Sequence, residues 1–368
     1  MKSSIVGVGI IGVGGLCSYG HFPAMERAQG AKLLALCDVN RESCELSARL
    51  HNVPAVYCDY HELLANPAID AVIVATPNYL HKSISIDALK AGKHVLCEKP
   101  MALNAADAAE VVGAAQAAGK KLMVDFTHRF WNRSIELKKA LMAGKLGDIY
   151  YIRLGWLRRR GTPAWGGNWF TTKSQAGGGC LVDIGCHMID LALWLAGERR
   201  VESVSGYVTQ RLGNSNGGGI ASDVEDFAAA SLTLQNGVHV HLEVAWALNL
   251  DRAKHAFIDV YGTQGGASWR AYGGTSGDPS PQLCFYDGKA LDCLIEPAVL
   301  EVETPSEGWV RAVQHFIDCI RYDKDPEPSG TCGLEVTQIT DAIYAASRRA
   351  GRPIRPISIA SRRAGFRH

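Results

Sequence analysis

Short apolar runs alternate with helix-length stretches over the first 127 residues. The runs predict strands at Ile5–Ile11, Lys32–Val39, Ala71–Thr76, His94–Cys97 and Lys121–Phe126. The stretches between them predict helices at Arg41–His51, Tyr79–Ala91 and Asn104–Ala118. Buried strands that alternate with helices are typical of a parallel sheet with helices on both faces. We therefore predict that residues 1–127 form an α/β domain with a doubly wound parallel sheet.

After about Phe130 the apolar positions follow a different pattern. An alternation with a period of two, clearest from Val238 to Trp246, is typical of strands with one exposed face. Helices are predicted over 134–143, 179–196, 309–321 and 334–351, and strands over 149–158, 201–211, 226–234, 238–248 and 255–261. We predict an α+β domain over 128–368 with a large, mostly antiparallel open sheet. Its C-terminal helix is expected to pack back on the first domain, and about the last ten residues to form a flexible tail.

Composition and charge exclude several classes of partner. The chain has 38 basic and 37 acidic residues, which leaves no broad electrostatic footprint for nucleic acid or an anionic membrane. No apolar run reaches the roughly 18 residues that a membrane span needs, and the N-terminus is unlike a signal peptide. The 11 cysteines form no CxxC pair and no zinc-ribbon spacing. We expect reduced thiols in a cytoplasmic protein.

Two overlapping glycine patterns lie at the first predicted strand. The run Gly7-Val-Gly9-Ile-Ile-Gly12 matches the dinucleotide-binding pattern first, but it shortens the strand to about residues 4–6. With the register at Gly12-Val-Gly14-Gly-Leu-Cys17, the whole run Ile5–Ile11 is the strand and a helix follows the turn. Phosphate binding at a helix N-terminus requires this context. We therefore predict a Rossmann domain whose phosphate-binding turn contains Gly12, Gly14, Gly15 and Leu16.

An acidic residue ends the second predicted strand at the expected distance. Asp38 follows Cys17 by 21 residues, close to the roughly 20 expected for a carboxylate that binds the ribose diol. The same carboxylate would repel a 2′-phosphate, which favours NAD over NADP. Arg41 can instead accept such a phosphate, so NADP stays open.

Polar residues follow two further predicted strands. Thr76-Pro77-Asn78 comes after one, and Glu98-Lys99 comes after the next. Open α/β sheets bind ligands at the carboxyl ends of their strands. A lysine there can bridge cofactor and substrate, donate to a substrate hydroxyl and have its pKa lowered by its surroundings. A surface ion pair that caps the strand is the alternative.

Asp183 and His187 share one face of the helix predicted over 179–196, since they lie four residues apart. A carboxylate can bind sugar hydroxyls while a near-neutral histidine takes or returns a proton. One alternative is a metal site that adds Cys180, and another is a purely structural histidine. Because the spacing offers no further ligand, we predict no metal.

Together these motifs resemble the Gfo/Idh/MocA oxidoreductases over essentially the whole chain. The resemblance rests on the glycine turn, on His21-Phe-Pro-Ala, on Thr76-Pro-Asn, on the run that ends in Glu98-Lys99-Pro100, and on the stretch 177–190. It implies reversible, NAD(P)-dependent oxidation of a ring hydroxyl of a sugar, glycoside or cyclitol. Lys99 and His187 would assist proton transfer and Asp183 would orient the substrate. The predicted cofactor-binding residues are Gly12, Gly14, Gly15, Leu16, Asp38, Arg41, Thr76, Pro77, Asn78, His81, Glu98 and Lys99.

The loop over 158–170 is similar to one in a sub-branch of that family that oxidises glycosides at the 3-hydroxyl. Its aromatic residues can stack on a sugar and its arginines can reach polar substituents, while a packed hairpin with a solvated edge is the alternative. The predicted substrate-binding residues are Lys99, Arg129, Arg158, Trp165, Asp183 and His187.

Two other functions stay open for the same residues. One is an NAD-dependent glycoside hydrolase that uses transient oxidation, and the other is a non-catalytic sugar or NAD sensor, which would need neither Lys99 nor His187. The resemblance also implies a homo-oligomer, either a dimer or a tetramer.

Overall fold

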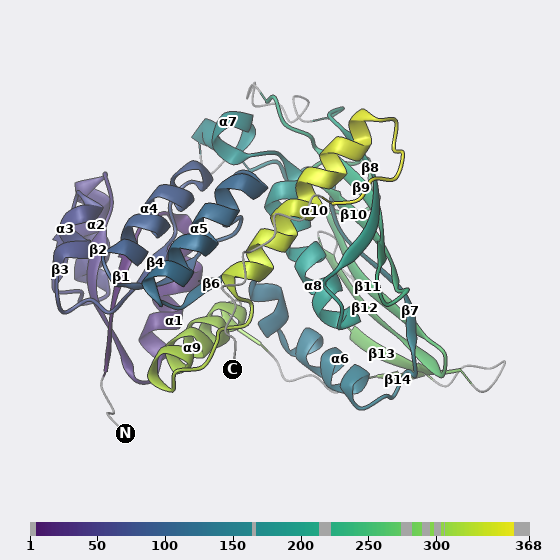
Figure 1. Ribbon diagram of the computed structural model, residues 1–368, viewed down its shortest axis with the longest axis horizontal. Coiled ribbons are helices and arrows are strands. Elements are labelled where there is room, and N and C mark those ends of the chain that lie inside the picture. Colours follow the sequence, from purple (N-terminus) through teal and green to yellow (C-terminus); the bar gives the residue numbers. More distant parts are fainter. Residues whose placement is uncertain are drawn as a thin grey trace.

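The computed structural model describes residues 5–163, 167–212, 222–273, 282–288, 295–297, 303–304 and 306–356. Within this range the chain forms two sheets, each with helices packed against it (Figure 1). The predicted substrate residue Trp165 and the predicted tail lie outside the described residues.

The first domain is built on a six-stranded parallel sheet with the strand order β3-β2-β1-β4-β5-β6. Its strands are β1 (Val6–Ile11), β2 (Ala31–Cys37), β3 (Ala55–Tyr57), β4 (Ala71–Val74), β5 (His94–Cys97) and β6 (Leu122–Val124). Its helices are α1 (Phe22–Arg27), α2 (Arg41–Leu50), α3 (Tyr60–Ala65), α4 (Asn78–Lys90) and α5 (Ala105–Ala118), with a π-helical turn η1 (Cys17–His21) before α1. The predicted doubly wound fold is confirmed, although β3 and α3 were not predicted. The strand order reverses between β1 and β4, and ligands bind at such a switch point.

Gly7 and Gly9, the first two glycines of the alternative dinucleotide-binding pattern, lie inside β1, where other atoms leave no room for a side chain. A Cβ atom on Gly7 would lie 1.9 Å from the Ala68 carbonyl oxygen, and one on Gly9 would lie 2.9 Å from a methyl group of Leu63. These two glycines therefore serve close packing within the sheet and not cofactor binding.

The second domain is built on an eight-stranded sheet with the order β14-β13-β12-β11-β7-β10-β9-β8. Its strands are β7 (Ile149–Arg158), β8 (Val201–Thr209), β9 (Phe227–Leu234), β10 (His239–Ala245), β11 (Lys254–Gly262), β12 (Gly265–Gly273), β13 (Gln282–Asp287) and β14 (Ile295–Pro297). All neighbouring strands are antiparallel except β10 and β7. The predicted large, mostly antiparallel sheet is confirmed, and β12 to β14 extend it beyond the predicted strands.

Helices cover one face of this large sheet, which we call the inner face (Figure 1). The helical elements that follow the first domain are η2 (Thr127–Phe130), α6 (Asn132–Met142), η3 (Gly167–Thr171), α7 (Lys173–Ala176), η4 (Leu181–Gly185), α8 (Cys186–Ala196), α9 (Glu307–Arg321) and α10 (Gly330–Arg348). In the described part of the chain the opposite, outer face carries no helix (Figure 1).

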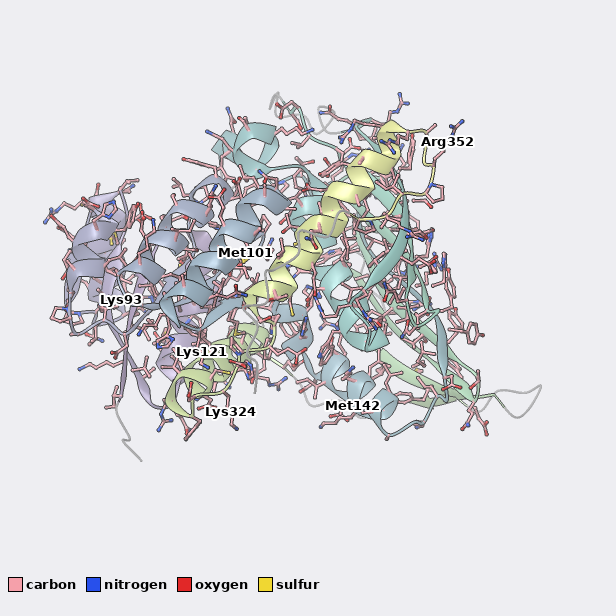
Figure 2. The ribbon with its side chains drawn as sticks, in the orientation of Figure 1. Lys93, Met101, Lys121, Met142, Lys324 and Arg352 are labelled. Atoms are coloured by element: carbon pink, nitrogen blue, oxygen red, sulfur yellow. The ribbon has the colours of Figure 1, made fainter. Side chains whose placement is uncertain are left out.

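The last two helices bind the sheets together. Phe316 and Ile317 of α9 are buried in one apolar cluster with Val8 and Ile10 of β1. Helix α10 crosses from α5 to β8 (Figure 1), and Met101 lies beneath it (Figure 2). The C-terminal helices therefore complete the packing of both domains.

The most apolar 18 residues of the helical stretch over 173–196 have a mean hydropathy of 1.5, and 83% of them are buried inside the fold. By length and composition alone this stretch could span a membrane, although Asp183 and Asp190 interrupt its apolar residues. Its burial identifies it as a core helix instead. The described residues contain ten free cysteines, of which eight are buried and Cys58 is exposed.

Candidate active site

The phosphate-binding turn follows β1 in the predicted register. Gly12 has φ +93°, and a Cβ atom there would lie 2.6 Å from the Ala75 carbonyl oxygen at the end of β4. Cβ atoms on Gly14 and Gly15 would instead meet nothing within 4 Å. The turn is thus tight against the switch point on one side and open on the other. A cofactor pyrophosphate fits this cradle, because its phosphates can approach the backbone where no side chain stands.

Asp38 links the end of β2 to this turn. One carboxylate oxygen accepts a hydrogen bond from the Val13 amide at 2.7 Å, and the other accepts one from the Asn40 amide at 2.9 Å. Each oxygen keeps a lone pair that a ribose hydroxyl can use. Arg41 lies nearby at the start of α2, where its guanidinium pairs with Glu45 at 2.8 Å.

The segment after β4 is held by buried side chains of α4. The Nε2 atom of His81 lies 2.7 Å from the Thr76 carbonyl oxygen, and its Nδ1 atom lies 2.7 Å from that of Pro100. The Asn78 amide donates to the Ala176 carbonyl oxygen at 2.9 Å. The side-chain nitrogens of His81 and Asn78 are therefore used within the protein, while the buried Thr76 hydroxyl has no partner among the described residues.

Lys99 meets Asp183 where the two domains join. Its ammonium group donates at 2.9 Å both to the Asp183 carboxylate and to the Asp183 carbonyl oxygen. The Trp246 indole N–H donates to the other carboxylate oxygen at 2.9 Å. Asp183 lies on the π-helical turn η4, and π-bulges of this kind are frequent at functional sites.

The predicted lowering of the Lys99 pKa is wrong. Burial, the largest single effect, lowers it, but Asp183, Cys186 and Glu98 together raise it by more, so that it stands well above the usual value for lysine. Conversely, burial raises the pKa of Asp183, but the charges of Lys99 and Arg158 lower it to about 2. The two residues therefore form a charged pair at neutral pH.

His187 lies one helical turn after Asp183 and is buried, with an exposed fraction of 8%. Burial and the Lys99 charge lower its pKa to about 3, so the imidazole is neutral at physiological pH. Its Nδ1 atom has no hydrogen-bond partner among the described residues. The His128 ring lies 4.7 Å from the His187 ring, centroid to centroid. A neutral imidazole can accept a proton from a hydroxyl group at a ring nitrogen that the substrate reaches.

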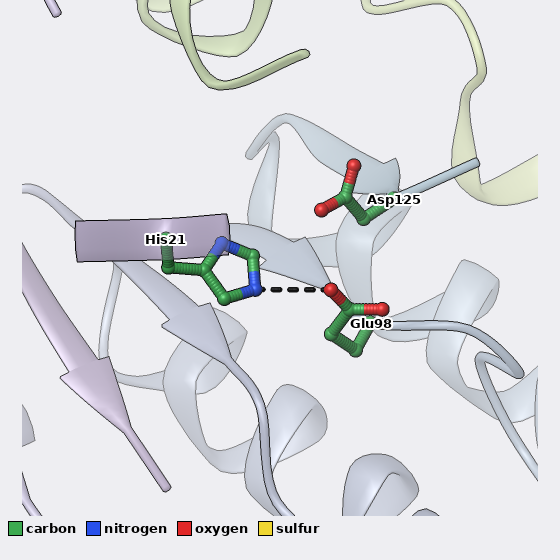
Figure 3. A group of neighbouring side chains, drawn as sticks. All are labelled: His21, Glu98 and Asp125. Atoms are coloured by element: carbon green, nitrogen blue, oxygen red, sulfur yellow. Dashed lines mark hydrogen bonds and ion pairs between the residues drawn. The ribbon is translucent and has the colours of Figure 1, made fainter. Parts of the chain in front are cut away.

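Three buried residues, His21, Glu98 and Asp125, lie close together (Figure 3). The His21 Nε2 atom donates to Glu98 at 2.9 Å, and potential ligand atoms of His21, Glu98 and Asp125 lie within 4.8 Å of one another. Burial and the Glu98 charge raise the pKa of Asp125 well above its usual value, which disfavours the charged carboxylate that a metal ion would need. Glu98 also accepts a hydrogen bond from the Lys99 amide at 3.2 Å. The cluster therefore favours support of Lys99 over metal binding.

The predicted substrate residues do not all reach this site. Arg129 is buried, and its guanidinium contacts Asp190 at 2.5 and 2.6 Å and Glu327 at 2.9 Å. These contacts give no support to the prediction that Arg129 binds substrate. Arg158 lies at the end of β7, and its charge affects the pKa of both Asp183 and His187.

Several residues at the site were missed by the sequence reasoning. They are Trp246 beside Asp183, His128 beside His187, Trp156 beside His128, and Lys254, whose ammonium lies 5.0 Å from the centre of the Trp156 ring. They come from separate strands and a short 3-10 turn, so no local spacing connects them. The alternation of side chains between the two faces of a sheet was the one usable signal along β7 and β11, because it puts Trp156 and Lys254 on the same face as the buried apolar residues.

Two family profiles match successive parts of the chain. A profile described as "Oxidoreductase family, NAD-binding Rossmann fold" matches residues 6–126. A second profile, described as "GFO/IDH/MocA C-terminal domain", matches residues 134–268.

Individual relatives resemble the chain over most of its length. D-glucoside 3-dehydrogenase of Escherichia coli is 34% identical over 275 residues, which are 73% of this chain and 78% of the relative. D-apiose dehydrogenase of Paraburkholderia graminis is 26% identical over 354 residues, or 94% of this chain and 88% of the relative. The structure of an aldose-aldose oxidoreductase from Caulobacter crescentus superimposes with a TM-score of 0.81 at 26% identity, covering 95% of this chain and 99% of that one.

Proposed function

The chain belongs to the Gfo/Idh/MocA family of NAD-binding oxidoreductases, and from this premise we propose that it oxidises a secondary ring hydroxyl of a sugar or glycoside. The observation that carries this proposal is the pairing of a neutral, buried His187 with the charged Lys99–Asp183 pair. Such a pairing supplies a proton acceptor beside a fixed positive charge. Oxidation of an alcohol needs both, because the hydroxyl loses its proton while negative charge grows on its oxygen.

The open side of the phosphate-binding turn supports NAD as the cofactor. The residues that would hold it are the backbone of Gly12 to Leu16, the Asp38 carboxylate and the free Thr76 hydroxyl. When bound, NAD accepts the hydrogen and two electrons from the carbinol carbon as hydride, which leaves a ketone once the hydroxyl proton has gone. Asp38 disfavours a 2′-phosphate, and Arg41 already has Glu45 as a partner. We therefore propose NAD rather than NADP.

The proton and the charge are handled by different side chains in this proposal. His187 accepts the hydroxyl proton at a ring nitrogen and returns it in the reverse reaction. The Lys99 ammonium stays charged and stabilises the developing alkoxide with a hydrogen bond. Asp183 holds Lys99 in place and, through its remaining lone pairs, can accept a hydrogen bond from a neighbouring substrate hydroxyl.

We further propose which kind of sugar is oxidised and at which ring position. The relative at 34% identity is a D-glucoside 3-dehydrogenase, and this likeness supports a glycoside oxidised at its 3-hydroxyl, with a cyclitol as the alternative. A family hydrolase that oxidises its substrate only transiently would use the same residues. We propose the dehydrogenase because the named relatives at high coverage are dehydrogenases.

The test is a screen for NADH formation with the purified protein over glycosides, hexoses and inositols, with NAD and NADP in parallel. We expect NADH absorbance to rise with at least one glycoside. Sugar release without net NADH would identify the hydrolase instead. No turnover of any substrate, together with tight NAD binding, would favour the sensor and overturn the proposal.

We also propose that the enzyme is a cytoplasmic homo-oligomer paired through the outer face of the large sheet. Tyr151 and Tyr261 stack on this face with ring centroids 5.6 Å apart, and Tyr261 is 40% exposed. Exposed aromatic rings on a helix-free sheet face are suited to an interface between subunits. Light scattering of the native protein tests this, and a monomer would contradict it.

A further inference from the structure

Two basic side chains, Arg158 and Lys254, lie over Trp156 on the inner face of the large sheet, and a third, Arg133, lies beside His128; none of the three has an acidic partner among the described residues. Arg158 ends β7 and lies directly opposite Lys254, which begins β11. The Arg158 guanidinium carbon lies 4.8 Å from the centre of the Trp156 ring, and the Lys254 nitrogen lies 5.0 Å from it. Arg133 of α6 approaches from the side of His128, with its guanidinium 3.4 Å from the His128 Nδ1 atom. We call Arg133, Arg158 and Lys254 the cationic cluster.

No carboxylate lies within ion-pair distance of the cationic cluster in the described residues. The acids that exert an influence there are engaged elsewhere: Asp183 binds Lys99, and Glu303 binds Arg311 at 2.8 Å. Other basic residues of the same sheet are paired. Arg153, on the outer face of β7, contacts Glu243 at 3.3 Å. In the part of the chain that the structure describes, a cation on the outer face of the sheet is thus neutralised, while two on the inner face and one on α6 have no ion-pair partner.

This arrangement costs free energy in the protein alone. Burial, followed by the charges of Arg133 and Arg158, lowers the pKa of Lys254. Burial likewise lowers the pKa of Arg133 to about 10, and only Glu303 acts in the opposite direction. Like charges that are partly removed from water repel each other more strongly than they do at an exposed surface. An anion placed among them would remove this repulsion.

The cationic cluster lies next to the reacting groups. The Trp156 ring is 5.2 Å from the His128 ring, which in turn is 4.7 Å from His187. Arg158 also lowers the pKa of Asp183 and of His187. An anion bound beside Trp156 would therefore lie close enough to His187 for one small molecule to reach both.

We infer that the sugar oxidised by this enzyme carries an anionic substituent, a carboxylate or a phosphate, which binds the cationic cluster while a ring hydroxyl lies at His187 and Lys99. This inference rests on the proposed function and specifies its substrate class. Guanidinium groups bind both oxyanions through paired hydrogen bonds, and the ammonium group adds a point charge.

The test compares methyl β-D-glucopyranoside with its 6-carboxylate and its 6-phosphate on the full-length enzyme. NADH formation gives kcat and KM, and calorimetry in the presence of NADH gives affinity without turnover. We expect at least about tenfold tighter binding of one anionic sugar than of the neutral one, with an advantage that shrinks as salt is added. The better of the two anions identifies the natural substituent.

Lys254→Gln and Arg158→Gln remove one charge each, and Arg153→Gln is the matched control on the outer face of the same strand. We expect each cluster variant to lower the selectivity for the anionic over the neutral sugar by at least about tenfold. The control should retain it, and Lys254→Arg should restore most of it. Two independent cluster variants guard against one that folds poorly, which circular dichroism would reveal.

Equal affinity for neutral and anionic sugars, or an equal loss for both in the cluster variants, would overturn the inference and leave the proposed function intact. Failure of the proposed function looks different. In that case no sugar produces NADH, while calorimetry still reports whether the cationic cluster selects anions.

Discussion

The Lys99 ammonium group lies 2.9 Å from the Asp183 carboxylate, although the two residues are 84 positions apart in the chain. The pair joins the carboxyl end of β5 in the first domain to the turn η4 in the second. It also explains why a buried lysine keeps its charge. The charge state of Lys99 should therefore depend on Asp183.

We predict that Asp183→Asn changes the pH dependence of catalysis. Without the carboxylate, burial dominates and the pKa of Lys99 falls. The variant should lose activity at alkaline pH values where the wild-type enzyme stays active. A profile of kcat/KM against pH measures this, because it reports the pKa values of essential groups in the free enzyme. Parallel profiles for the two proteins would contradict the proposed role of Asp183.

We predict that His187→Gln lowers kcat by about 10²–10⁴-fold, the usual range for loss of a general base. NAD affinity should be unchanged, because His187 lies outside the phosphate-binding turn and the Asp38 site. Fluorescence titration with NADH checks the binding, and His239→Gln on the exposed outer face serves as the control. Wild-type turnover in His187→Gln would remove His187 from the mechanism.

The same variant should be less sensitive to acid. The pKa of His187 is about 3 in the folded protein and 6.5 in the unfolded chain, since burial opposes its charge. Between these values only the unfolded chain binds the proton, so this group makes the protein lose stability as the pH falls from 6.5 toward 3. His187→Gln should remove up to ~1.4 kcal/mol of this loss per pH unit. Urea unfolding at several pH values in this window measures the free energy of unfolding of both proteins. Identical slopes of this free energy against pH would show that folding does not lower the pKa of His187.

Two glycines of the phosphate-binding turn should respond differently to substitution. Gly14→Val places a side chain in open space, so the melting temperature should hardly change while NAD affinity falls by at least about tenfold. Gly12→Ala combines a positive φ with a contact of 2.6 Å to Ala75, so it should lower the melting temperature. Calorimetry and thermal melting separate the two effects. Loss of stability in Gly14→Val would mean that the open side is packed in solution.

Much of the first domain could be predicted from the sequence because its signals are local. The apolar run at Ile5–Ile11 and the acidic residue Asp38 predict the register of the glycine turn, and the structure places Gly7 inside β1 and Gly12 in the turn after it. Asp183 and His187 could be placed on one face because four residues make about one helical turn. Lys99 could be predicted as a site residue because it follows a strand, and ligands bind at the carboxyl ends of the strands in such a sheet.

The rest depends on contacts that no local pattern contains. Trp246 and Asp183 meet across 63 positions, and the ionised state of Lys99 follows from a partner in the other domain. Arg129 was predicted to bind substrate because the sequence does not reveal its ion-pair partner, Asp190, which lies on a separate helix. The strands β12 and β13 lack a long apolar run; β12 pairs with β11, and β13 pairs with β12.

The packing of α9 against β1 also has a consequence for how the protein is made. The ribosome makes β1 long before α9, yet the apolar cluster that buries Val8 and Ile10 includes Phe316 and Ile317. That side of the first domain's sheet therefore stays uncovered in the nascent chain until α9 has been made. Until then an apolar surface stays open to chaperones, so a stop codon before α9 should yield an aggregating fragment instead of a working NAD-binding domain.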